Sequence, residues 1–169
     1  MTLLVPFDGS ALAEAALVRA SQFGTAFDEA VLAVGMIPAG DDEYARDHGW
    51  IGPDEGFEVD AVASELHSQV TDVCASVDFR YEVIERYASQ GTISNRVRRI
   101  AKDEDATMVF IGSENAGRLI SSLHSVGSAI AADESYDVVI VRHPTDDECR
   151  EGERPLHRRL LKSDFFLPD

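Results

Sequence analysis

Long apolar runs are missing from these 169 residues, and the pattern of the first residues predicts no leader segment. No stretch approaches the roughly 18 consecutive apolar residues of a membrane-spanning helix. The N-terminus has no basic region followed by an apolar stretch, which a secretory signal needs. We therefore expect a cytoplasmic protein without membrane contact. The length favours one main domain with a sizeable core.

Cysteine is scarce as well, because Cys74 and Cys149 are the two cysteines of the chain. Two cysteines make neither a framework of disulfides nor a zinc site, and the histidines stand at no metal-ligand spacing. No serine, histidine and aspartate are ordered so that a fold would assemble them into a triad. We expect no metal site and no catalytic residues.

Lysine is almost absent and is represented by Lys102 and Lys162. Acidic residues outnumber basic ones by 31 to 15, which gives a formal net charge of −16. Such a surface repels the phosphates of nucleic acids, so nucleic acid is not an expected partner. The composition is similar to that of haloarchaeal proteins, in which concentrated salt screens the self-repulsion. We favour a halophilic protein over the alternative, an acidic protein of an ordinary cytosol.

Short apolar runs alternate with helical periodicity along residues 1–143. Strands are predicted from apolar runs at residues 3–5, 30–37, 107–111 and 138–141, and from period-two alternation, typical of a sheet edge, at 79–83. Helices are predicted from the cap Ser10 to the stop Gly24, over residues 59–77, from the cap Thr92 to residue 101, and through Ala132. Residues 38–57 lack a period and predict a long surface loop.

This alternation indicates an α/β fold, in which helices cover both faces of a parallel sheet to make a three-layer sandwich. Five strands with right-handed crossovers are arranged most economically in the order 3-2-1-4-5. The strand order then reverses between strands one and four, and ligands bind beyond the carboxyl ends of strands at such a switch point. Asp8 follows the first strand and Gly112 follows the fourth, so both are predicted to reach it.

A glycine-rich loop follows the fourth strand, with the spacing Gly112-x4-Gly117-x9-Gly127-Ser128. Glycine lets the backbone approach an anion, and N–H groups of such a loop or of a helix N-terminus bind phosphate oxygens. No lysine follows the glycines, so the loop is not a Walker A loop. The pattern predicts a nucleotide that is held by main-chain groups.

Side chains of the same loop have opposing effects on phosphate binding. Ser113 and Ser128 offer hydroxyl donors, and Arg118 can reach a phosphate. The carboxylate of Glu114 would repel one. Two interpretations remain: a nucleotide site, or a structural turn that has lost its ligand.

The loop resembles the phosphate loop of the universal stress protein (UspA) family, whose ATP-binding members carry G-x2-G-x9-G-[ST]. Gly117-x9-Gly127-Ser128 fits this motif, whereas the distance from Gly112 to Gly127 is two residues longer than in the family. The position three residues after Gly112 is Asn115. The resemblance also covers residues 3–10, 32–37 and 138–143.

The resemblance implies an adenine nucleotide alpha-hydrolase-like fold that binds ATP or AMP, with or without Mg²⁺, and acts in stress response as a regulator or sensor rather than as a fast enzyme. Slow ATP hydrolysis is the most activity that we expect. The resemblance also places Asp8 against the adenosine and the backbone of Val34 against the adenine. From its position alone, Asp8 can equally order the turn before the first helix, and Val34 can be a plain core residue. The alternative function is a dimerisation or partner-docking module with an empty site.

We expect two parts: a nucleotide-binding domain over residues 1–143 and a C-terminal extension over residues 144–169. The strand at residues 138–141 is predicted to be an edge strand, which invites pairing. The family resemblance implies a homodimer through this strand. Three states of the extension stay open: packed across a partner, covering the chain's own edge, or disordered.

Overall fold

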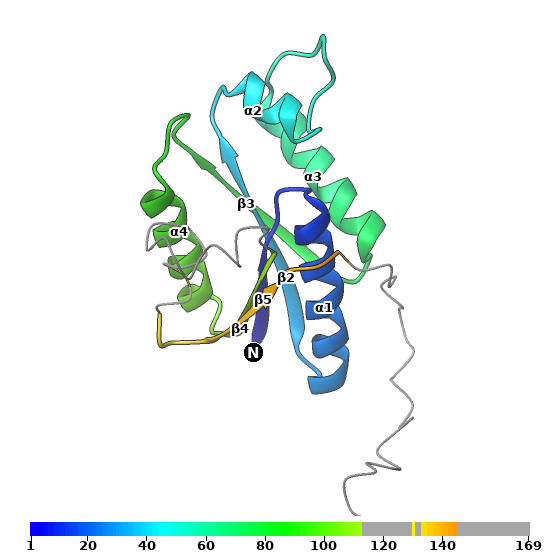
Figure 1. The fold of residues 1–169 in the computed structure, drawn as a ribbon, viewed down its shortest axis with the longest axis vertical. Coiled ribbons are helices and arrows are strands. Elements are labelled where there is room, and N and C mark those ends of the chain that lie inside the picture. The colour runs from blue at the N-terminus through cyan, green and yellow to red at the C-terminus, as the bar shows by residue number, and fades with distance from the viewer. Residues whose placement is uncertain (113–129, 131–132, 145–169) are drawn as a thin grey trace, which may run out of the picture.

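Five parallel strands form the central sheet of the computed structural model, which describes residues 1–112, 130 and 133–144 (Figure 1). The strands are β1 (Thr2–Pro6), β2 (Ala30–Pro38), β3 (Asp78–Ile84), β4 (Ala106–Gly112) and β5 (Asp137–Val141). The helices are α1 (Ala11–Phe27), α2 (Asp42–Asp47), α3 (Val59–Val73) and α4 (Gln90–Asp103). The spatial order of the strands, β3-β2-β1-β4-β5, confirms the predicted fold class and topology.

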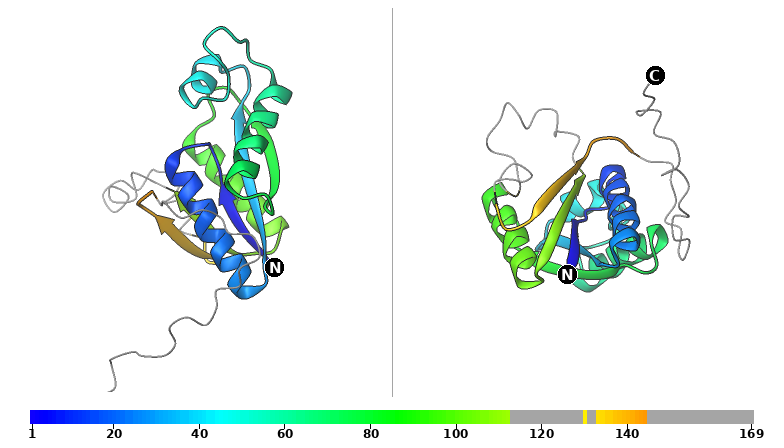
Figure 2. Two further views of the ribbon diagram at one scale, coloured as in Figure 1. Left: turned by 90° about the vertical axis from the view of Figure 1, so that its right-hand side faces the viewer. Right: turned by 90° about the horizontal axis from the view of Figure 1, so that it is seen from below.

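Helices cover both faces of the sheet and so create two apolar cores. α1 and α3 lie on one face and α4 lies on the other, as the view from below shows (Figure 2). β1 supplies both cores because successive side chains of a strand point to opposite faces. Leu3 and Val5 enter the core beneath α1 and α3, while Leu4 enters the core beneath α4. The continuous apolar runs of the central strands therefore reflect burial on both faces.

The boundaries of three helices differ from the prediction. α3 ends at Val73 and not at residue 77, because the backbone at its C-cap Cys74 is extended, with φ of −157° and ψ of 103°. α1 does begin at the Ser10 cap, whose hydroxyl accepts a hydrogen bond from the Ala13 N–H at 3.2 Å. It does not stop at Gly24 but continues to Asp28, where φ of 59° ends it in the left-handed region. Gly24 instead permits close packing, since a Cβ there would lie 2.8 Å from the Glu29 carbonyl.

The N-cap of α4 is Ser89 rather than Thr92. The Ser89 hydroxyl accepts a hydrogen bond from the Thr92 N–H at 3.1 Å, so Thr92 lies in the first turn of the helix. Both residues are good capping types, and the backbone leaves the extended region at Ser89, with φ of −67° and ψ of 157°.

The segment between β2 and α3 is not the irregular surface loop that its composition predicts. It contains the six-residue helix α2, which Asp41 caps by accepting from the Tyr44 N–H at 3.0 Å. Ala45, Trp50 and Ile51 are buried in the core beneath α1 and α3. Tyr44 and Phe57 pack against the same core, so the segment folds back onto the domain although its apolar residues follow no helical or strand period.

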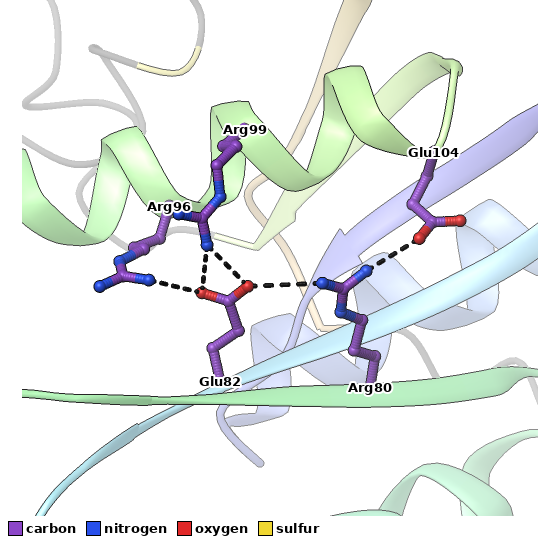
Figure 3. Close-up of polar contacts among 5 residues, drawn as sticks. All are labelled: Arg80, Glu82, Arg96, Arg99 and Glu104. Carbon is purple, nitrogen blue, oxygen red and sulfur yellow. Dashed lines mark hydrogen bonds and ion pairs between the residues drawn. The ribbon is translucent and has the colours of Figure 1, made fainter.

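A network of charged side chains joins the edge strand β3 to α4 (Figure 3). The Glu82 carboxylate forms ion pairs with three arginines: Arg80 at 3.5 Å, Arg96 at 3.3 Å and Arg99 at 3.0 Å. Arg80 also reaches Glu104 at 2.9 Å. The Glu82 side chain is 13% exposed, so one nearly buried carboxylate holds three half-exposed guanidinium groups.

Two strands lie at the edges of the sheet, as predicted. β3 and β5 each pair with one neighbour, β2 and β4 respectively. On β3, Tyr81 and Val83 remain 39% and 43% exposed. Among the described residues, no helix is both long and apolar enough to span a bilayer. Residues 145–169, and with them almost all of the predicted extension, lie outside the described ranges, as does most of the helix expected through Ala132.

Candidate functional site

The candidate site lies where neighbouring strands of the sheet end at different heights along the strand direction. β1 pairs with β2 as far as Pro6 and Val34, whereas β2 and β3 continue together to Pro38 and Ile84. β1 turns away after Pro6 into the segment that leads to α1. The end of β2 therefore extends past β1 at the switch point, where the strand order reverses between β1 and β4.

Asp8 lies in the turn between β1 and α1 and has contacts through both its side chain and its main chain. Its Oδ1 accepts a hydrogen bond from the Ser10 N–H at 2.9 Å, and its carbonyl accepts one from the Trp50 indole N–H at 2.9 Å. The side chain thus orders the turn, as one of the two sequence interpretations holds. Oδ2 receives no hydrogen bond from residues 1–112, 130 or 133–144, which leaves a carboxylate oxygen available at the switch point.

Val34 is buried, with 1% exposure, and its carbonyl accepts a hydrogen bond from the Phe7 N–H at 2.9 Å. Its side chain belongs to the core beneath α4. Alternate residues of a strand turn their N–H and C=O groups toward the same side, so the main chain of Met36 faces the same edge as that of Val34. The ladder between β1 and β2 ends at Pro6 and does not reach Met36. Among the described residues, β1 therefore gives no strand partner to the main chain of Met36, two residues beyond Val34.

Gly112 ends β4 against the first turn of α1. A Cβ at this position would overlap the carbonyl of Leu12 and would lie 2.7 Å from the amide nitrogen of Ala13. Only glycine permits this contact, which brings the N-terminus of α1 to the beginning of the glycine-rich loop. Asp8 and Ser10 immediately precede that helix N-terminus. The structure thus packs the end of β4 against the first turn of α1, the helix into which the Asp8 turn leads.

The other predicted phosphate-binding residues are not among those that the structure describes. They are Ser113, Gly117, Arg118, Gly127 and Ser128. Glu114, whose carboxylate is predicted to repel phosphate, also lies outside the described residues. Within the described ranges, no group of three or more histidine, cysteine, aspartate or glutamate side chains is suited to hold a metal ion.

Three aromatic residues beside Asp8 were missed by the sequence reasoning. The rings of Tyr44 and His48 stack with centroids 3.9 Å apart, and Trp50 packs edge-on to Tyr44 at 5.3 Å. Burial, followed by the negative charges of Asp8 and Asp41, raises the pKa of Tyr44 to about 12. The signal in the sequence was the presence of ring-bearing side chains in a segment rich in glycine and acidic residues.

Comparison with models of protein families gives a match over residues 1–142 to the Universal stress protein family. The chain belongs to this family. The match includes β1 with Asp8, the end of β2 and the whole of β4, so the switch point lies within the family domain. Among curated protein sequences, none matches this universal stress protein significantly.

Solved structures of other universal stress proteins share its fold. One in complex with cAMP is 22% identical with a TM-score of 0.54, over 86% of this chain and 98% of that chain. One from Burkholderia pseudomallei is 16% identical with a TM-score of 0.53, over 84% of this chain and 96% of that chain. One from Archaeoglobus fulgidus is 15% identical with a TM-score of 0.57, over 86% of this chain and 45% of that chain.

Proposed function

We propose that this universal stress protein binds ATP or AMP at the switch point and acts in the cytoplasm as a regulator or sensor in stress response. The observation that carries the proposal is the contact of Gly112 with the first turn of α1, directly behind the turn that holds Asp8. That contact brings a carboxylate acceptor, a helix N-terminus and the start of a glycine-rich loop to one place. The cAMP complex of a universal stress protein with the same fold supports an adenine nucleotide as the ligand.

The chain offers different groups to the two ends of such a nucleotide. Asp8 Oδ2 is suited to accept a hydrogen bond from the nucleoside, and the main chain at Val34 and Met36 lines the end of β2 beside it. Phosphates would be held by the loop residues Gly112, Ser113, Gly117, Arg118, Gly127 and Ser128, with or without Mg²⁺. We assign no residue a catalytic role, because the site has no evident general base.

The test is a thermal unfolding series at high salt with millimolar ATP or AMP. Binding to the native state alone raises the melting temperature, and ligand at 100 times its Kd contributes about 2.7 kcal/mol of stability. Gly127→Val should abolish the shift, because a branched Cβ would crowd the phosphate. Arg19→Gln, on the exposed side of α1, should retain the full shift. No shift in the unmodified protein with either nucleotide would contradict the proposal.

The longer spacing between Gly112 and Gly127, together with Glu114, favours a second candidate: a docking module with an empty site. The protein as purified distinguishes the two, because bound nucleotide adds absorbance in the nucleotide band. A nucleotide-free preparation that also shows no thermal shift would favour the docking module.

We further propose that the protein is a homodimer joined through β5 and that it functions at high salt. β5 is an edge strand, and its central residues Val138, Val139 and Ile140 are only half-buried in the single chain. Pairing with a second copy would satisfy this edge through a two-fold contact. The net charge of −16 supports the halophilic interpretation.

A further inference from the structure

The indole of Trp50 holds the Asp8 turn from outside the turn itself. Its N–H donates to the Asp8 carbonyl at 2.9 Å, and Trp50 is 3% exposed. The indole nitrogen also lies 3.5 Å from the position that a Cβ on Gly9 would occupy, and Gly9 has φ of +81°. Trp50 therefore packs directly on the residue whose left-handed backbone lets the chain turn after Asp8.

Trp50 is itself fixed by its own segment. Its backbone N–H donates to the Ala45 carbonyl at 2.8 Å, and Ala45 is fully buried. Tyr44 packs edge-on to the indole at 5.3 Å, and the His48 ring lies 5.2 Å from it. These contacts leave the indole N–H little freedom, so its direction is set before any ligand arrives.

We propose that Trp50 is a positioning residue that keeps the Asp8 turn in its ligand-ready conformation, an inference that rests on the proposed nucleotide site. Within the turn, the Asp8 side chain is tied by one hydrogen bond, from the Ser10 N–H. Loss of the indole donor would leave the partly buried Asp8 carbonyl unpaired, and the turn would move to hydrate it. The carboxylate would then lose its fixed direction, and the ligand would have to restore it at a cost in affinity.

The test compares Trp50→Phe, which keeps an aromatic ring but removes the donor, with Ile51→Val, which trims the next buried residue of the same segment. Ile51 belongs to the same core and is 8% exposed, so its variant controls for a general loss of stability. Two quantities are measured in each protein: hydrogen exchange of the Ser10 amide without ligand, by NMR, and the Kd for ATP at high salt.

We expect Trp50→Phe to speed Ser10 exchange and to weaken ATP binding roughly three- to ten-fold, the range expected for one neutral hydrogen bond. Ile51→Val should change neither beyond its effect on global stability. Equal Ser10 exchange in the two variants would overturn the inference even if ATP binds. If the unmodified protein binds no ATP, the proposed function fails, while faster Ser10 exchange in Trp50→Phe alone still supports Trp50 as the residue that holds the turn.

A measurement on the unmodified protein covers the case in which Trp50→Phe does not fold. Trp50 is the single tryptophan of the chain, so its indole N–H gives one identifiable NMR signal. We expect this signal to exchange slowly with solvent in the free protein, because the indole N–H is buried and donates to the Asp8 carbonyl. Rapid exchange in the free protein would contradict the inference.

Discussion

Gly112 and Leu12 lie in direct backbone contact: a Cβ on Gly112 would overlap the Leu12 carbonyl oxygen. The contact joins the end of β4 to the first turn of α1, the helix that follows β1. β1 and β4 are the two strands between which the strand order reverses. Because a helix backbone cannot move aside without losing its hydrogen bonds, the absence of a side chain at residue 112 is a condition of this packing. The glycine that the sequence assigns to phosphate binding therefore also has a structural role.

Gly112→Ala is expected to destabilise the fold by about 3 kcal/mol or more, at the upper end of overpacking effects, because the added methyl group meets backbone rather than a movable side chain. Gly91→Ala is the matched control. Within the part of the chain that the structure describes, its Cβ would meet only the Ser89 hydroxyl at 3.6 Å, so we expect no loss and a gain of up to about 1 kcal/mol in helix stability. Urea unfolding of both variants checks this, and equal stabilities would show that α1 adjusts freely.

Alkaline pH should destabilise the protein through Tyr44. Its pKa is raised from 10.0 to about 12, so the native state keeps its proton where the unfolded chain has lost it. The stabilisation is fully present below pH 10 and is lost as the pH rises toward 12. Tyr44→Phe should flatten this loss in unfolding experiments across that range, whereas Tyr87→Phe, at a site 85% exposed, should not. If Tyr44→Phe leaves the slope of the free energy of unfolding against pH unchanged, the raised pKa of Tyr44 does not cause the alkaline loss of stability.

Acid should remove the stabilisation that Asp133 provides. Hydrogen bonds from Ser135, Arg98 and Lys102 hold the pKa of this carboxyl well below its usual range. The folded state therefore binds the proton less readily than the unfolded chain, so the stabilisation is present above about pH 4 and is lost as the pH falls. Asp133→Asn should lower stability at neutral pH and reduce its dependence on acid. Glu134→Gln, an exposed neighbour, serves as control and should leave the acid dependence as it is.

Low ionic strength should destabilise the fold, because a net charge of −16 repels itself when salt does not screen it. Circular dichroism during thermal unfolding, recorded from dilute buffer to molar salt, should show a rising melting temperature. Full stability in dilute buffer would contradict the halophilic interpretation.

The full chain should have twice its monomer mass of 18.5 kDa in light scattering at high salt. The reason is the edge position of β5, whose outer backbone groups pair with no strand of the described residues. Truncation after Pro144 tests the extension. A full chain that is monomeric and becomes dimeric on truncation would show that the extension covers the edge, and two monomeric proteins would contradict pairing through β5.

The pattern of the sequence was sufficient to predict the sheet. The apolar runs at residues 3–5 and 107–111 are continuous because β1 and β4 are buried on both faces, and the alternation at residues 79–83 marks the edge strand β3. Helix ends were less predictable. Ser89 and Thr92 are both capping residues, and which one caps depends on where the chain leaves β3. Gly24 has the chemistry of a helix stop but is required by packing against Glu29.

Within the candidate site, the sequence by itself determined which residues come after the strands: Asp8 after β1 and Gly112 after β4, whose convergence results from the strand order alone. Only the tertiary structure decided which side chains surround them. Trp50 reaches the Asp8 carbonyl across a separation of 42 residues. No local periodicity encodes such a contact, because it arises when an apolar ring in a polar segment is buried against a turn far away in the chain.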